Sequence, residues 1–215
     1  MNKKIMMAVM CCFACVLMGA SSIATAGALP KALQEGLNML AQTQGFTCEF
    51  EQTIVFTDEA TQVYGGTLAV ARPGRFRWQY TKPYEQLYIS NGEGVWLYEP
   101  DLMQAQWLQG LESVDPVVMR LLNGDVKSEE ITLLGSPGEK YTYHIRIGDK
   151  QDVWLSLADG MPAWLESRDA LDNRNRITLK KIIKHQPDEA LFHFDVPKGV
   201  DVISTAVSAA GGLNE

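Results

Sequence analysis

The sequence is poor in the residues from which metal centres and catalytic sites are built. Its 215 residues include four cysteines and three histidines. The histidines are His144, His185 and His193, and no two of them have the spacing of a metal-binding pair. Gly-x-Ser-x-Gly and Walker-type sequences are also missing. We therefore expect no catalytic residues, no metal and no cofactor.

Positive charge is also scarce. The chain carries 19 Lys and Arg against 26 Asp and Glu, a formal net charge of −7. Nucleic-acid binding depends on basic side chains that contact phosphates, so this balance argues against a nucleic-acid partner. Hydrophobic residues make up 46% of the chain, which is enough for the core of one domain or of two small ones.

The N-terminus has the pattern of a secretory signal peptide. Lys3 and Lys4 precede an apolar run over residues 5–18, which is short for a membrane span. Small residues follow and end at Ala24-Thr25-Ala26. We expect a signal peptide over residues 1–26, cleaved after Ala26, and hence export to the periplasm. A retained N-terminal anchor is the alternative.

Cleavage would change both the charge and the cysteine count. It would remove Lys3 and Lys4 but no acid, leaving 189 residues with a net charge of −9. Three cysteines would leave with the peptide, so Cys48 alone would remain and could form no internal disulfide. Cys48 is then either buried and inert or an exposed thiol in an oxidising compartment.

The rest of the chain predicts a mainly β (α+β) domain over residues 27–203. Leucines at helical spacing predict a helix over residues 29–44. Pro116 and Gly124 favour a second, shorter helix over residues 113–123. Between residues 46 and 185, eleven β-branched and aromatic segments alternate with Gly-, Pro- and Asn-containing turns. We expect a single curled antiparallel sheet forming an incomplete β-barrel, followed by a disordered tail over residues 204–215.

Alternation within the strands indicates one strongly apolar face. Phe76, Trp78 and Tyr80 fall on one side of their segment, and Arg75 and Arg77 on the other. Such side chains usually form an ordinary core. Here, two helices can cover only part of so large an apolar face, which favours a cavity for a lipid-like ligand.

Aromatic residues, glycines and prolines recur in a set of motifs that spans most of residues 46–104 and resumes near residue 194. The motifs are Phe46-x-x-x-Phe50-x-Gln52, Gly66-x-Leu68-x-Val70-x-Arg72-Pro73-Gly74-x-Phe76-x-Trp78-x-Tyr80-x-x-Pro83, Ser90-Asn91-Gly92-x-x-Val95-Trp96-x-Tyr98-x-Pro100, Gln104 and Phe194-x-Val196-Pro197-x-Gly199-Val200. With these motifs the chain resembles the outer-membrane lipoprotein carrier proteins of the LolA family.

The resemblance implies a function and a set of partners. A member of this family would be a monomeric periplasmic chaperone with a helical lid over an apolar cavity. It would receive acylated lipoproteins from an inner-membrane ABC transporter and deliver them to an outer-membrane lipoprotein receptor. Arg72 matches the arginine that controls the lid, while Phe76 and Trp78 match aromatic residues that face the acyl chains.

We combine the strand pattern with the resemblance to predict the acyl-chain cavity. Met119 and Leu122 would lie at its mouth. The complete predicted lining is Phe50, Leu68, Val70, Phe76, Trp78, Tyr80, Leu87, Ile89, Trp96, Met119 and Leu122.

Other functions remain as alternatives. A periplasmic lipid- or hydrophobic-ligand-binding protein, or an envelope-stress sensor, could share the same half-barrel. The outer-membrane receptor itself would need a cysteine just after the cleavage site, where the sequence reads Gly27-Ala28. A lipid hydrolase would need a paired nucleophile and base, and none is visible.

Overall fold

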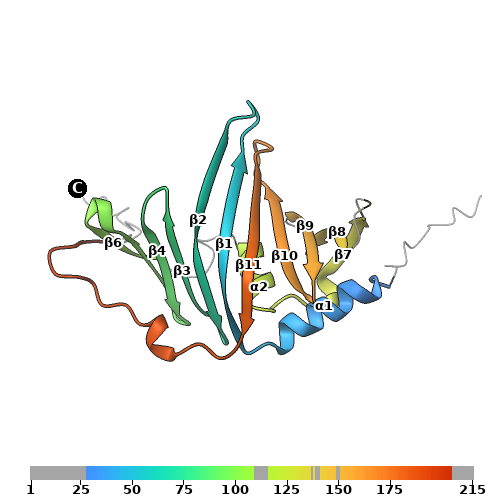
Figure 1. Cartoon of the computed structure of the whole chain (residues 1–215), viewed down its shortest axis with the longest axis horizontal. Helices are drawn as coiled ribbons and strands as arrows, with labels where there is room; N and C mark the ends of the chain where they lie inside the picture. Colours follow the sequence, from blue (N-terminus) through green and yellow to red (C-terminus); the bar gives the residue numbers. More distant parts are fainter. Residues whose placement is uncertain (1–27, 109–115, 137, 139–140, 149–150, 205–215) are drawn as a thin grey trace, which may run out of the picture.

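One open sheet dominates the molecule (Figure 1). The computed structural model describes residues 28–108, 116–136, 138, 141–148 and 151–204. Twelve strands within these residues lie in the order β12-β6-β5-β4-β3-β2-β1-β11-β10-β9-β8-β7. They are β1 (Gly45–Val55), β2 (Thr61–Ala71), β3 (Arg75–Lys82), β4 (Gln86–Asn91), β5 (Val95–Glu99), β6 (Gln104–Leu108), β7 (Ile131–Gly135), β8 (Thr142–Ile147), β9 (Gln151–Ala158), β10 (Met161–Arg168), β11 (Arg174–Lys184) and β12 (Asp201–Ser204).

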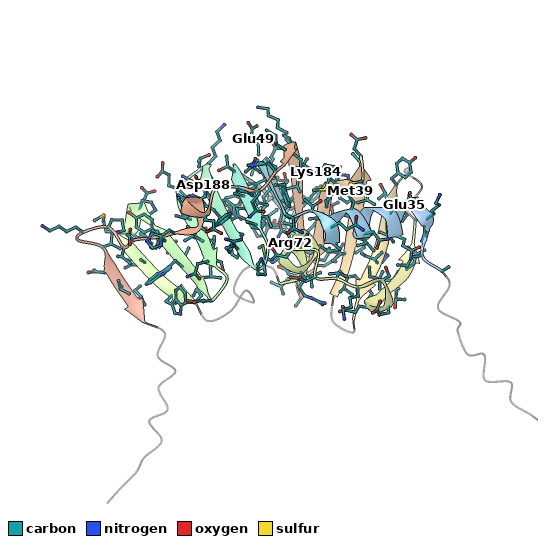
Figure 2. The ribbon with its side chains drawn as sticks, turned by 90° about the horizontal axis from the view of Figure 1, so that it is seen from below. Glu35, Met39, Glu49, Arg72, Lys184 and Asp188 are labelled. Atoms are coloured by element: carbon teal, nitrogen blue, oxygen red, sulfur yellow. The ribbon has the colours of Figure 1, made fainter. Side chains whose placement is uncertain are left out.

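The sheet is curled but not closed. Its middle is β1, which pairs antiparallel with β2 on one side and with β11 on the other. Its two edges are β12 and β7. Viewed from below, the sheet bends into an open V with α2 inside it (Figure 2). The predicted mainly β fold with an incomplete barrel is therefore confirmed.

Two α-helices of the described chain lie against the inner side of this bend. They are α1 (Lys31–Gln42) and α2 (Pro116–Leu122), and both fall within the predicted ranges. The predicted positions 113–115 lie outside the described residues. The same part of the chain also contains the short 3-10 turns η1 (Pro100–Leu102), η3 (Ser128–Glu130) and η4 (Glu189–Phe192). No helix in the described part of the chain is long and apolar enough to cross a membrane.

The last strand was not predicted. After β11 the chain passes through η4 and returns to the far edge of the sheet, where β12 pairs parallel with β6 (Figure 1). This strand is short, and Val202 and Ile203 are 54% and 42% exposed. Because its pairing is non-local, neither a turn signal nor a buried face marks it in the sequence. Ser204 is its final residue, and positions 205–215 of the expected tail lie outside the described residues.

The core lies between the inner face of the sheet and the two helices. Leu33, Leu37 and Leu40 of α1 belong to the same buried cluster as Phe76 and Trp78 of β3. We call the face of the sheet that carries Phe76 and Trp78 the concave face, and the opposite one the convex face. The fold thus places its largest apolar side chains on the inside of the bend.

Candidate functional site

Strand register gathers aromatic and aliphatic side chains on the concave face of β1, β2 and β3. Residues directly opposite each other in antiparallel strands point to the same side of a sheet. Phe46 lies opposite Val70, which lies opposite Phe76. Leu68 lies opposite Trp78 in the same way. Phe50, Leu68, Val70, Phe76 and Trp78 of the predicted lining are thus brought together, each at most 4% exposed.

Tyr80 continues this face toward the end of β3 that is remote from the helices. Its ring centroid lies 5.0 Å from that of Phe50 and 6.1 Å from that of Trp78. Gly66 lies opposite Tyr80, and a side chain there would collide with the backbone carbonyl of Gln79. The glycine lets β2 and β3 approach closely beneath these rings.

Helix α2 fills the hollow of the sheet. Met119 and Leu122, the predicted residues at the cavity mouth, are both fully buried, as are Val118 and Leu121 to within 1%. They share one buried cluster with Phe76 and Trp78. Since apolar side chains surround nearly the whole helix, α2 packs against the sheet and the neighbouring elements on several sides. The structure is therefore a closed form in which the chain covers its own apolar face.

Arg72, the predicted lid-control residue, connects the two helical regions. It follows the end of β2, and its Nη1 donates a hydrogen bond of 2.5 Å to the carbonyl oxygen of Ala41 in α1. Its guanidinium also lies directly against Gly124, just after α2, where it leaves no room for a side chain. Figure 2 shows Arg72 near the middle of the molecule, beside α2.

The environment of Arg72 is only partly polar. Burial lowers the pKa of its guanidinium, and the nearby Asp125 carboxylate opposes that shift. Its Nε atom is buried and has no hydrogen-bond partner among the described residues. One polar side chain thus joins the C-terminal parts of α1 and α2 at the edge of an apolar core.

Three predicted cavity residues lie on the wrong side of the sheet. Trp78 lies opposite Tyr88, so Tyr88 shares the concave face, and Leu87 and Ile89 must point to the convex face. Trp96 lies opposite Ile89 and shares its face. The expectation that Leu87, Ile89 and Trp96 line the cavity is therefore wrong. Alternation within one strand separates its two faces, but only the register against the neighbouring strand shows which face is concave.

The convex face has its own cover. The ring of Trp96 lies 5.2 Å from that of Trp107 and 5.8 Å from that of Phe194, which belongs to the segment between η4 and β12. Phe192 of η4 packs with Ala69 and Ala71 in a second, smaller buried cluster. Trp96 therefore supports the attachment of the C-terminal segment, and Leu87 and Ile89 are buried on the same convex face.

Sequence reasoning also missed residues that do face the concave side. Tyr64 and Tyr88 make ring contacts with Tyr80 at 6.1 and 6.3 Å. Tyr64 could have been found, since it falls two residues before Gly66 and four before Leu68 in the same alternating strand. Tyr88 could not, because its face depends on the register of β4 against β3.

Reactive groups are few in this region. Cys48 is 5% exposed on the concave face, and burial raises the pKa of its thiol to about 12. Of the two alternatives for Cys48, a buried inert side chain or an exposed thiol, the structure has the first. Among the described residues, no group of three or more His, Cys, Asp or Glu side chains is arranged to hold a metal ion. The concave face offers contact with apolar ligands and no evident chemistry on them.

Comparison with known proteins agrees with this arrangement. The family model described as outer membrane lipoprotein carrier protein LolA matches residues 41–195. The chain belongs to the LolA family. Since LolA proteins are carriers, membership also confirms that the chain is not an enzyme.

Curated relatives extend the similarity beyond the matched segment. An outer-membrane lipoprotein carrier protein of Bordetella pertussis is 31% identical over 192 residues, covering 85% of this chain and 91% of its own. A protein of the same name from Pseudomonas paraeruginosa is 33% identical over 181 residues, covering 80% and 87%. LolA relatives thus match nearly the whole described domain.

A solved structure supports the fold independently of sequence. An uncharacterized conserved protein from Thermus thermophilus superimposes with a TM-score of 0.51 at 11% identity, covering 80% of this chain and 96% of its own. At so low an identity the likeness concerns the fold alone. The open curled sheet of this LolA-family chain therefore recurs in a distant protein.

Proposed function

We propose that the chain is a periplasmic carrier that holds the acyl chains of lipoproteins against its concave face. The observation that supports this most directly is the cover of that face. Phe76, Trp78 and their neighbours are buried in one cluster with a seven-residue helix, α2, whose valine, methionine and leucine side chains are all buried. If acyl chains displaced α2, the sheet would exchange one set of apolar contacts for another. Dispersion contacts are not directional, so acyl chains can take the place of the α2 side chains.

The route of the cargo is part of the same proposal. We infer that the protein receives lipoproteins from an inner-membrane ABC transporter and passes them to an outer-membrane receptor, acting as a monomer. The names of its relatives support a lipoprotein cargo. The signal-like pattern over residues 1–26 supports export to the periplasm.

The magnitude of acyl-chain burial explains why a closed form is useful. Three chains of about 15 methylenes at about 0.8 kcal/mol each would contribute roughly 36 kcal/mol. Non-covalent affinities reach a ceiling near about 18–21 kcal/mol, and a carrier close to it would not release its cargo. We propose that burial is partial and that the contacts between α2 and the sheet, lost on opening, offset much of the gain.

A release assay tests the function. Spheroplasts would be incubated with purified chain beginning at Gly27, and the soluble fraction would be examined for lipoproteins bound to it. We expect outer-membrane lipoproteins to appear in that fraction and to elute with the protein. A sample without the protein provides the control. If the protein binds an apolar fluorescent probe yet solubilises no lipoprotein, it is a hydrophobic-ligand binder of the alternative class.

A further inference from the structure

The concave face changes character along its strands. Near the helices it carries Phe46, Phe76 and Trp78, each at most 2% exposed. Toward the hairpin between β1 and β2, at the top of Figure 1, the same face of the same strands carries phenols and amides. The polar side chains at this end are Gln52, Gln62, Tyr64, Tyr80 and Asn175, with Ile54 among them, and Tyr88 lies nearer the helices, opposite Trp78.

Four tyrosines form a continuous row toward this end. We call Tyr64, Tyr80, Tyr84 and Tyr88 the tyrosine rim. The ring of Tyr64 lies 6.1 Å from that of Tyr80 and 6.0 Å from that of Tyr84, and Tyr80 lies 6.3 Å from Tyr88. Because Tyr80 also stacks on the buried Trp78 while Tyr84 is 48% exposed, the row leads from the core to solvent.

Two hydroxyl groups of the tyrosine rim, those of Tyr64 and Tyr80, donate hydrogen bonds to uncharged side chains. Tyr80 donates to the Gln52 side-chain oxygen at 2.8 Å, and the Gln52 amide donates to Asn175 at 2.9 Å. Tyr64 donates to the side-chain oxygen of Gln62 at 2.6 Å. Tyr84 lies beside Tyr64, with their ring centroids 6.0 Å apart, and its proximity raises the pKa of the Tyr64 phenol.

These groups match one part of an acylated protein. Acyl chains are joined to a protein through ester and amide carbonyls, which accept hydrogen bonds but carry no charge. A tyrosine supplies a donor for such a carbonyl and an apolar ring for the adjoining methylenes. Gln62 is exposed, so a ligand carbonyl can replace it as the acceptor of the Tyr64 hydroxyl, with water then solvating the glutamine.

We propose that the tyrosine rim binds the ester and amide carbonyls at the junction between the acyl chains and the cargo protein. The inference rests on the proposed function and adds a polar subsite to it. With the chains against Phe76 and Trp78, the junction lies where the face turns from apolar to phenolic, and the protein part of the cargo emerges past the exposed Tyr84. The rim thereby favours acylated protein over a plain hydrocarbon of equal length.

Removal of hydroxyl groups tests the subsite while leaving the rings in place. The variants are Tyr64→Phe and the double variant Tyr64→Phe/Tyr80→Phe. Tyr98→Phe is the matched control, because Tyr98 lies on the convex face, with its ring 5.4 Å from that of Phe194. Two ligands are compared: a synthetic peptide whose N-terminal cysteine carries three acyl chains, and the carbonyl-free probe N-phenyl-1-naphthylamine.

We expect Tyr64→Phe to weaken lipopeptide binding about fivefold and the double variant about 10- to 30-fold, the range given by one and two neutral hydrogen bonds. Probe affinity should stay within about twofold in every variant, and Tyr98→Phe should match the wild type for both ligands. Circular dichroism melts report folding. If the double variant unfolds, Tyr64→Phe still carries the test, since its hydroxyl contacts the exposed Gln62.

Two results would overturn the proposal. One is unchanged lipopeptide affinity in both variants. The other is an equal loss for lipopeptide and probe, which would mean that the hydroxyls only shape the cavity. A wild-type protein that binds the probe but not the lipopeptide would instead overturn the carrier function, so the two failures are distinguishable.

Discussion

The two faces of β3 are covered in different ways. On the concave side, Phe76 and Trp78 are buried with α1 and α2 through apolar contacts. On the convex side, Arg75 forms an ion pair of 2.8 Å with Glu189 of η4, and the same C-terminal segment then adds β12 to the edge of the sheet. Apolar contacts tolerate exchange, whereas strand pairing and ion pairs fix one geometry. Although the convex cover also contains apolar contacts, we propose that the inner cover is the one that moves.

The sharpest test of this contrast is a pair of neighbouring truncations on β3. Phe76→Ala removes a fully buried ring and should lower the free energy of unfolding by about 3–5 kcal/mol. Arg77→Ala, on the opposite face, should cost under about 1 kcal/mol. Urea unfolding measures both. Similar losses for the two variants would contradict the division into faces.

A second test concerns the tryptophan that the sequence placed on the wrong side. Trp96→Ala should destabilise the protein by about 2 kcal/mol, since it removes half-buried ring contacts with Trp107 and Phe194. Acyl-chain binding should stay unchanged, because Trp96 lies on the convex face. Titration with the acylated peptide provides the measurement. A loss of affinity as large as that caused by Trp78→Ala would show that Trp96 contacts the acyl chains.

A third test acts on the connection between the helices. Arg72→Leu removes the hydrogen bond to Ala41 and should destabilise the closed form by about 1 kcal/mol. Cargo would then be retained longer, so transfer to a receptor should slow about fivefold while uptake is little affected. A stopped-flow or pull-down transfer assay would follow this step.

Gly124→Ala is the matched variant for Arg72. It leaves the arginine in place but puts a methyl group against the guanidinium, at a position with φ +66°. We expect a slower transfer of the same kind. Normal transfer in both variants would show that Arg72 does not stabilise the closed form.

The smallest reactivity is expected at Cys48, whose thiol is buried on the concave face. With its pKa raised to about 12, the thiol has about 1,000-fold less thiolate at pH 8 than an exposed cysteine. Iodoacetamide should therefore leave Cys48 unmodified in the folded protein. Thr47→Cys/Cys48→Ser places a half-exposed thiol on the convex side, where we expect ordinary reactivity. Fast alkylation of native Cys48 would show that the concave face opens often.

The sequence predicted features that depend on local pattern. Leucine spacing predicted α1, and the alternation of Phe76 and Trp78 predicted the apolar face of β3. The faces of β4 and β5 could not be predicted, since they depend on which residue of β4 lies opposite Trp78. A shift of one residue in that register exchanges Tyr88 with Leu87 and Ile89.

Non-local pairing was the other limit. β12 is stabilised by its parallel neighbour β6 and by the path of the chain across the convex face. The four residues of β12 themselves indicate neither this pairing nor this path. The tyrosine rim was missed for a related reason, since its members come from β2, β3, β4 and the turn after β3, and only their register brings the rings together.

The position of β1 at the middle of the sheet has a consequence for the order of folding. One of its neighbours, β2, follows directly in the chain, but the other is β11. Glu49 of β1 therefore pairs with Lys180, a residue far along the chain. A chain that enters a compartment from its N-terminus cannot complete the centre of this sheet until nearly its whole length has arrived. Contacts of such long sequence separation also form slowly. The topology therefore makes the completion of the centre of the sheet a late step of folding.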